Sequence, residues 1–232
     1  MPLALRYPPD QRFDTFIDAP AGALAQLRAL AERTGADWLF LAGASKTGKT
    51  HLALALCAAA EQAGRRAAYL PGVVAAGRVR DALDALDGND VVALDGLEKI
   101  VGNDNDESRD DEIALFDFHN RARASGMAVL YTAQAMPDEL ALALPDLRSR
   151  LQQCARIALS SLDDDGRRAV LRDRAQRRGL VLEEAAIDWL LTRTDRDLGS
   201  LVGLLDKLDR ASLAAQRRVT VPFLRQVIGT DA

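Results

Sequence analysis

Residues 43–50 read Gly-Ala-Ser-Lys-Thr-Gly-Lys-Thr and form the strongest chemical motif of the chain. The run fits the pattern G-x-x-x-x-G-K-[ST] between an apolar segment and a helical pattern, which is the context in which this motif binds phosphate. Backbone N–H groups of such a loop converge on phosphate oxygens. Lys49 then meets the terminal phosphates, and Thr50 can offer its hydroxyl to Mg²⁺. We therefore predict that a nucleotide is bound by Gly43, Ala44, Ser45, Lys46, Thr47, Gly48, Lys49, Thr50 and His51.

A carboxylate ends the apolar run Val91–Asp95. Asp95 is the expected partner of the loop, because it can hold the hydration shell of Mg²⁺ beside Thr50. The alternative explanation of this residue is a turn at the end of a strand. The next residue is Gly96, where many ATPases of this kind carry a second carboxylate that orients the attacking water. Glu98 is near in sequence but is not directed to the same site by the pattern, so we expect intrinsic ATP hydrolysis to be slow or absent.

Short apolar runs alternate with helical patterns between residues 38 and 159. Strands are expected at 38–42, 67–70, 91–95, 127–132 and 155–159, and helices at 49–63, 73–86, 108–125 and 137–151. Continuous apolar strands separated by helices predict an α/β fold with a parallel sheet covered on both faces. Gly64, Gly88 and Gly126 stand where helices should end.

The strand pattern stops after residue 159. Three aspartates, at 163–165, precede an arginine-rich helical pattern at 167–178, which suits the dipole of a helix without any binding function. Further helices are expected at 183–194, 198–216 and 221–228. We predict a nucleotide-binding α/β domain at 1–161, with a short extended segment at its N-terminus, and a small all-helical domain at 162–232.

Composition narrows the class of protein further. The chain has 232 residues, of which 48% are hydrophobic, and its formal net charge is -4, which argues against a general nucleic-acid binder. Two cysteines, Cys57 and Cys154, cannot make a disulfide scaffold. No apolar run approaches the roughly 20 residues of a membrane helix, and the first residues do not resemble a secretory signal. We therefore expect a cytoplasmic protein.

These motifs resemble those of AAA+ P-loop ATPases, and within them the initiator DnaA and its shorter relatives, the Hda-type regulatory inactivators of DnaA. The resemblance spans nearly the whole chain and is carried by residues 13–16, 48–52, 116–121, 129–132, 136–137 and 145–151. Its most specific part is the run Leu-Asp-Arg-Ala-Ser-Leu-Ala-Ala-Gln-Arg-Arg at 208–218, followed by Thr-Val-Pro-Phe at 220–223, which is similar to the Hda type. The resemblance implies a three-layer αβα domain with a five-stranded parallel sheet and a helical lid.

The resemblance also implies roles for single residues. Thr132 matches a sensor position on a strand between the loop strand and the Asp95 strand, although strand propensity alone explains a threonine there. Arg150 matches the arginine finger, which acts in trans on the nucleotide of a neighbouring subunit; the alternative is a solvated arginine at a helix end. Lys46 and Gly199 depart from the pattern, and Arg196 could substitute for the lid arginine missing at Gly199.

The function implied by the resemblance is negative regulation of chromosomal replication initiation. The protein would hold ADP or ATP with Mg²⁺, contact DnaA and stimulate its ATP hydrolysis through Arg150. Relatives dock on the DNA polymerase sliding clamp through an N-terminal segment, of which Leu3 and Leu5 would remain here. A homo-oligomer is possible, and no direct sequence-specific DNA binding and no membrane partner are expected. The alternatives are an autonomous AAA+ ATPase, such as a helicase loader, and a nucleotide-free scaffold of the same fold.

Overall fold

Five parallel strands form the centre of the first of two compact units, Met1–Ser161 and Leu162–Ala232, in a computed structural model of the chain. The structure describes residues 10–32, 37–75, 78–101, 106–193, 203–205, 207–208 and 219–228. The strands are β1 (Trp38–Gly43), β2 (Ala67–Pro71), β3 (Val91–Asp95), β4 (Ala128–Ala133) and β5 (Ala155–Leu159), in the order β2-β3-β4-β1-β5. The predicted five-stranded parallel sheet is confirmed.

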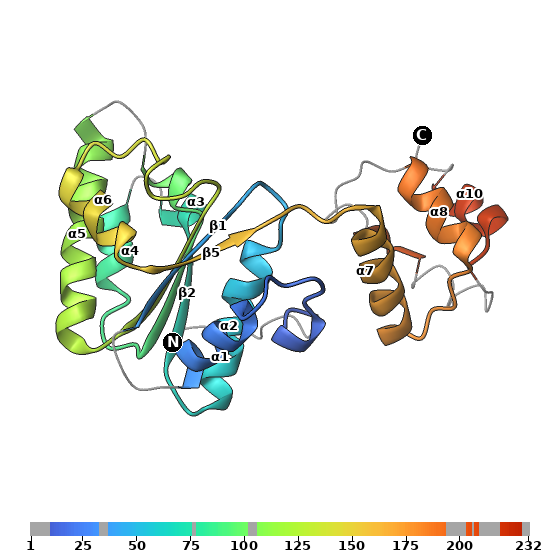
Figure 1. Ribbon diagram of the computed structural model, residues 1–232, viewed down its shortest axis with the longest axis horizontal. Coiled ribbons are helices and arrows are strands. Elements are labelled where there is room, and N and C mark those ends of the chain that lie inside the picture. Colours follow the sequence, from blue (N-terminus) through green and yellow to red (C-terminus); the bar gives the residue numbers. More distant parts are fainter. Residues whose placement is uncertain are drawn as a thin grey trace. The chain divides into compact units, whose positions relative to one another are not determined.

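Helices cover both faces of this sheet (Figure 1). One face carries α1 (Ala23–Glu32) and α2 (Lys49–Gln62), and the other carries α4 (Val79–Asp84), α5 (Asp106–Ser125) and α6 (Pro145–Gln152). Shorter turns are η1 (Phe13–Thr15), α3 (Gly72–Ala75) and η2 (Leu97–Lys99). Each face has its own buried core, one around Leu52 and Leu56 of α2 and the other around Leu115 and Phe118 of α5. The predicted αβα layering is therefore confirmed.

Two expectations about helices were wrong, and one helix was missed. Residues 73–86 do not form one helix, because Arg78 has non-helical dihedral angles and its N–H closes a turn onto the Ala75 carbonyl, so α3 and α4 are separate. The helix expected from 137 begins only at Pro145, which holds Leu144 in an extended conformation and is suited to the first turn. Helix α1 was not predicted. Two glycine ends were predicted correctly, because Gly64 and Gly126, with φ of 78° and 74°, follow the ends of α2 and α5. Gly88 also has positive φ, at 86°, but it lies beyond the end of α4 at Asp84 and does not end that helix.

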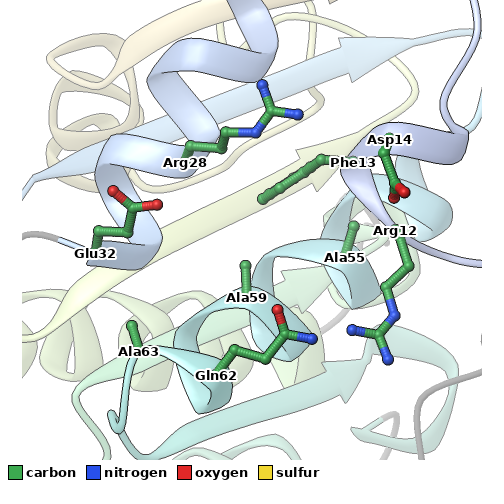
Figure 2. A pocket seen from close by; sticks show the side chains of 9 residues that line it. All are labelled: Arg12, Phe13, Asp14, Arg28, Glu32, Ala55, Ala59, Gln62 and Ala63. Atoms are coloured by element: carbon green, nitrogen blue, oxygen red, sulfur yellow. The ribbon is translucent and has the colours of Figure 1, made fainter.

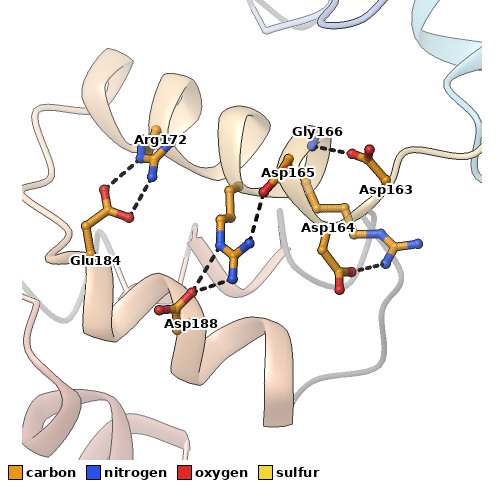
Figure 3. Close-up of polar contacts among 9 residues, drawn as sticks. Asp163, Asp164, Asp165, Gly166, Arg172, Glu184 and Asp188 are labelled. Atoms are coloured by element: carbon orange, nitrogen blue, oxygen red, sulfur yellow. Dashed lines mark hydrogen bonds and ion pairs between the residues drawn. The ribbon is translucent and has the colours of Figure 1, made fainter.

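The second unit is helical in its described part. It contains α7 (Asp164–Arg177), α8 (Glu184–Arg193) and α10 (Val221–Ile228), while most of the helix expected at 198–216 lies outside the described residues. The Asp163 side chain accepts the Gly166 N–H at 2.7 Å and so begins α7, as the run of aspartates suggested. Arg172 binds Glu184, and Arg168 binds Asp188 (Figure 3). These exposed pairs join α7 to α8 above a core that includes Leu171, Ile187 and Leu224.

None of the helices in the described ranges combines the length and the apolar character needed to cross a lipid bilayer.

Candidate nucleotide-binding site

The loop between β1 and α2 has the backbone that its motif requires. Gly48 precedes the first residue of α2 with φ 95°, and a Cβ there would stand 2.6 Å from Phe16 Cε2, so only glycine fits. Lys46 also has positive φ, at 69°, although it is not glycine. A lysine therefore adopts the left-handed conformation at the position where the sequence departs from its relatives, at a cost of about 1 kcal/mol. Its side chain is exposed.

The second lysine of the loop is held inside it. Lys49 is 8% exposed, and its Nζ donates to the carbonyl oxygens of Gly43 at 2.6 Å and Ala44 at 2.7 Å. The Thr47 hydroxyl donates to the same Ala44 carbonyl at 3.0 Å. Burial lowers the pKa of Lys49, and the carboxylates of Glu98 and then Asp95 oppose this lowering. The ammonium is thus a buried charge supported by two loop carbonyls and two nearby carboxylates.

Asp95, at the end of β3, accepts hydrogen bonds from three hydroxyl groups. Thr50 and Tyr69 donate to Oδ2 at 2.7 and 2.8 Å, and Thr132 donates to Oδ1 at 2.6 Å. The donors come from α2, β2 and β4, and strand pairing sets Asp95 opposite Thr132. Because each hydrogen bond to a carboxylate is charge-assisted, the network fixes this side chain firmly. The structure therefore brings together Thr50, Asp95 and Thr132, as the sequence suggested.

Thr132 uses its hydroxyl entirely within this network. The group donates to Asp95 and accepts the Gly96 N–H at 2.9 Å, and the residue is 0% exposed. A sensor that reaches a terminal phosphate or its water needs an accessible polar atom, and in this arrangement Thr132 offers none. The geometry gives it the role of orienting Asp95.

Tyr69 is a site residue that the sequence analysis missed. Its hydroxyl shares Asp95 Oδ2 with Thr50, and burial and the Asp95 charge raise its pKa above the usual value. The signal was weak, because β2 is a partly buried strand with no motif. Tyr69 pairs with Ala93, which faces the same side of the sheet as Asp95 two residues later, and only this pairing brings it to the site.

Thr50 and Asp95 fit Mg²⁺. This ion is usually bound through one or two protein oxygens together with substrate phosphates and water. Since the Thr50 hydroxyl hydrogen points to Asp95, its lone pairs remain for a cation, and Asp95 lies 2.7 Å away to hold coordinated water. In the described ranges no cluster of three or more His, Cys, Asp or Glu side chains has a geometry that would hold a metal by itself.

His51 lies behind the loop and contacts the N-terminal segment. Its Nε2 is 2.8 Å from the Arg12 carbonyl and 3.3 Å from Thr15 Oγ1, and its ring meets Phe16 edge-on at 5.3 Å. Phe16 in turn contacts Gly48. The histidine thus fastens residues 12–16 to the start of α2, a supporting role rather than a phosphate contact.

Arg150 lies in the last turn of α6 and is half-buried. Its guanidinium forms no hydrogen bond or ion pair with any residue that the structure describes. The helix itself is anchored at its other end: both oxygens of buried Glu112 accept backbone N–H groups, from Ala143 at 3.0 Å and Leu144 at 2.6 Å. A fixed helix therefore carries a charged group that has no partner in this part of the chain.

The predicted site residues Arg196, Leu3 and Leu5 lie outside the described residues, as does Gly199, the position at which the lid arginine is missing.

A separate groove of about 730 Å³ lies between η1, α1 and α2 (Figure 2). It is lined by Arg12, Phe13, Asp14, Arg28, Glu32, Ala55, Ala59, Gln62 and Ala63. No residue of the loop at 43–50 contributes to it, so this groove is not the predicted phosphate site.

The sheet order, the loop and the helical second unit define an AAA+ fold. One similar structure is domain III of DnaA from Thermotoga maritima, with 20% sequence identity, coverage of 97% of this chain and 98% of that one, and a TM-score of 0.77. Another is AMPPCP-bound DnaA from Aquifex aeolicus, with 21% sequence identity, coverage of 87% of this chain and 66% of that one, and a TM-score of 0.67. The T. maritima RuvB Holliday junction branch migration motor is also similar, with 18% sequence identity, coverage of 97% of this chain and 72% of that one, and a TM-score of 0.64.

The second, helical unit gives a more specific similarity within the AAA+ proteins. Residues 164–228 match the family model described as Hda, lid domain. The predicted resemblance to the Hda type is therefore confirmed for residues 164–228, and the rest of the chain has the AAA+ fold seen in domain III of DnaA.

Proposed function

We propose that this protein is a negative regulator of chromosomal replication initiation that stimulates ATP hydrolysis by DnaA. The observation that supports this most is Arg150, a half-buried arginine at the end of an anchored helix with no partner among the described residues. A charge that the described residues leave without a partner is suited to a partner on another molecule. The Hda lid domain and the DnaA-like fold favour DnaA as that molecule.

The chemistry assigned to Arg150 is neutralisation of charge in a transition state. As a terminal phosphate transfers to water, negative charge spreads over its oxygens and the leaving group, and a guanidinium placed there lowers the barrier. Lysine would substitute poorly, because it has no planar pair of donors. The effect on the partner is therefore expected to depend on the guanidinium group and not on positive charge alone.

The protein's own nucleotide would have a structural role. The loop at 43–50 would hold ADP or ATP through backbone N–H groups and Lys49, with Thr50 and Asp95 supporting Mg²⁺. The AMPPCP complex of A. aeolicus DnaA is consistent with an adenine nucleotide in this fold. Leu3 and Leu5 would contribute to docking on the sliding clamp, which would bring Arg150 to DnaA on DNA.

The experiment is a reconstituted assay of hydrolysis of DnaA-bound ATP, with clamp loaded on DNA. The proteins compared are the wild type, Arg150→Ala, Arg150→Lys and, as a control at an exposed position of the same helix, Gln152→Ala. We expect Arg150→Ala to lower the stimulated rate by about 10³-fold and Arg150→Lys nearly as much. Undiminished stimulation by Arg150→Ala would remove the finger from the mechanism. Rapid multiple turnover by the protein alone would favour an autonomous ATPase, and no nucleotide binding at millimolar ADP would favour a scaffold.

A further inference from the structure

Gly96 supplies no second carboxylate beside Asp95, but its backbone turns the chain back toward the nucleotide-binding loop. Its φ of 84° and ψ of 58° are left-handed, and the turn η2 follows at once, closed by the Lys99 N–H on the Gly96 carbonyl at 2.9 Å. Leu97 is buried and anchors this turn. As a result Glu98 folds back, and its Oε1 lies 3.7 Å from the point where a Cβ on residue 96 would stand. A carboxylate thus occupies the space beside residue 96, although residue 96 does not supply it.

The Glu98 carboxylate is held in this place by one oxygen. Its Oε2 accepts the N–H of Gln134 at 3.2 Å, directly after the end of β4. Its Oε1 has no hydrogen-bond donor among the residues that the structure describes, and the side chain is half-buried. One anchored oxygen and one unoccupied oxygen at the carboxyl edge of a parallel sheet are what a group that orients water requires.

Glu98 also faces the lysine of the loop. Of the two carboxylates that oppose the lowering of the Lys49 pKa by burial, Glu98 acts more strongly than Asp95. Lys49 is the residue of this motif that meets the terminal phosphates of a nucleotide. The distance to residue 96, the contact with Gln134 and the influence on Lys49 therefore put the Glu98 carboxylate on the phosphate side of the loop.

We propose that Glu98 orients and deprotonates the water that hydrolyses ATP bound in the protein's own loop. The inference depends on nucleotide binding at this loop, which is part of the proposed function. The water oxygen forms a bond to the terminal phosphorus while the bond from that phosphorus to the bridging oxygen breaks. The electron pair of the broken bond stays on ADP, the water proton passes to Glu98 Oε1, and inorganic phosphate leaves. Glu98 then returns its proton to solvent.

The consequence is slow conversion of bound ATP to ADP within the protein itself. A positioned carboxylate contributes about 10²-fold or more to such a reaction. Thr132 gives no accessible polar atom to assist it, so the reaction is expected to be slow. The ADP-bound form would then arise without any partner.

The test compares the full-length wild type with Glu98→Gln and with Glu139→Gln. Glutamine keeps an oxygen for the Gln134 N–H but cannot accept the water proton. Glu139 is a matched control, because its carboxylate also accepts a backbone N–H, from Met136 at 3.3 Å, and it is exposed. Hydrolysis of radiolabelled ATP is followed in single turnover with protein in excess, and the affinities for ADP and ATP are measured by calorimetry.

We expect slow hydrolysis by the wild type and by Glu139→Gln, and a rate at least about 10²-fold lower for Glu98→Gln with ADP affinity retained. Absence of hydrolysis by the wild type would overturn the inference. So would an unchanged rate for Glu98→Gln, or loss of ADP binding by this variant, since the carboxylate would then be structural. A gain in ATP affinity over ADP, without a change in rate, would instead identify an electrostatic selector against the third phosphate.

The same proteins separate this inference from the proposed function. ADP-loaded Glu98→Gln is expected to stimulate DnaA as the wild type does, and Arg150→Ala is expected to keep the slow hydrolysis of its own ATP. If Arg150→Ala still stimulated DnaA fully, the proposed function would fail while the Glu98 result stood. If Glu98→Gln hydrolysed ATP as fast as the wild type, the inference about Glu98 would fail while the role of Arg150 stood.

Discussion

Asp95 and Arg150 are both charged groups proposed to act on nucleotides, but their surroundings are opposite. Asp95 accepts three hydroxyl donors, whereas Arg150 has no hydrogen-bond or ion-pair partner in the described part of the chain. A group that acts on the protein's own ligand is held by its neighbours before the ligand binds. A group that acts on another molecule can be positioned through its backbone instead, which leaves its charge available.

The backbone of α6 gives this kind of positioning to Arg150. Glu112 accepts the two N–H groups that precede the helix, and Arg148 donates to the Leu142 carbonyl at 2.6 Å. Leu147 and Leu151 are buried beneath the same helix. The position of the guanidinium is therefore set by contacts of the helix backbone and of neighbouring side chains. Removing the guanidinium should leave the fold unchanged.

The largest effect is expected when the Asp95 network is broken. Asp95→Asn replaces one acceptor oxygen by an amide, so at least one hydroxyl loses its acceptor, and buried Thr132 cannot turn to water. We expect the free energy of unfolding, measured in urea, to fall by about 3 kcal/mol. Arg150→Ala is the matched comparison and should change it by less than about 0.5 kcal/mol. An equal loss of unfolding free energy in the two variants would contradict the proposed difference between Asp95 and Arg150.

The next effect concerns the anchor of α6. Glu112→Gln places an amide NH₂ against one of the two N–H groups that the carboxylate accepts, and the residue is 1% exposed. Stability should fall by about 2 kcal/mol. Stimulation of DnaA should also fall, while ADP affinity stays the same, because the loop at 43–50 does not contact Glu112. Asp110→Asn, on the exposed face of α5, is the control and should alter neither property.

The sequence predicted the sheet closely because buried parallel strands are continuous apolar runs. The observed β3 and β5 have the predicted bounds, β1 and β2 are one residue longer at their ends, and β4 is shifted by one residue at both ends. The helices between 73 and 86 and from 137 to 151 were less predictable. Their composition favours helix throughout, while the breaks depend on a turn at Arg78 and on Pro145, which holds Leu144 in an extended conformation.

The site was predictable where a local motif defines it and not where it depends on contacts between distant segments. Residues 43–50 and Asp95 follow from short patterns, and the structure brings Thr50 to Asp95. Tyr69 reaches Asp95 only through strand pairing, and Glu112 reaches Leu144 across 32 residues. Glu98 is close to Asp95 in sequence, but the left-handed turn at Gly96 that directs it to the loop has no unambiguous sequence signal.

A smaller effect is expected from His119, which lies near Arg150. Burial, followed by the charges of Arg150 and Arg123, lowers the pKa of His119 to about 4. Its Nδ1 is 3.1 Å from the Tyr131 hydroxyl, and its buried Nε2 has no partner in the described part of the chain. The unfolded chain, with an ordinary pKa near 6.5, binds a proton in the window between these values. Stability is therefore complete above pH 6.5 and decreases as the pH falls toward 4.

Between pH 7 and pH 5 this should lower the free energy of unfolding by about 1.5 kcal/mol. Urea titrations of the wild type and of His119→Phe, which cannot bind a proton there, would isolate the contribution. Arg150→Ala should raise the pKa of His119 and reduce the pH dependence, which NMR titration of the ring would show directly. A His119 pKa that does not respond to Arg150→Ala would mean that the guanidinium lies farther from the histidine than the structure indicates.

The smallest effect is expected from Tyr69→Phe, which removes one of the three donors to Asp95 and keeps the ring in place. The carboxylate retains Thr50 on the same oxygen and Thr132 on the other, so the free energy of unfolding should fall by only about 1 kcal/mol. Because Tyr69 helps to orient Asp95 toward Thr50, the Mg²⁺-dependent part of nucleotide affinity should fall about fivefold, and the Mg²⁺-independent part should not change. Tyr131→Phe is the matched control, since its hydroxyl contacts His119 and not Asp95. If both tyrosine variants lowered Mg²⁺-dependent affinity equally, the loss would reflect general loosening of the sheet. The position of Asp95 would then not depend on its hydrogen-bond donors, and the contrast with Arg150 would fail.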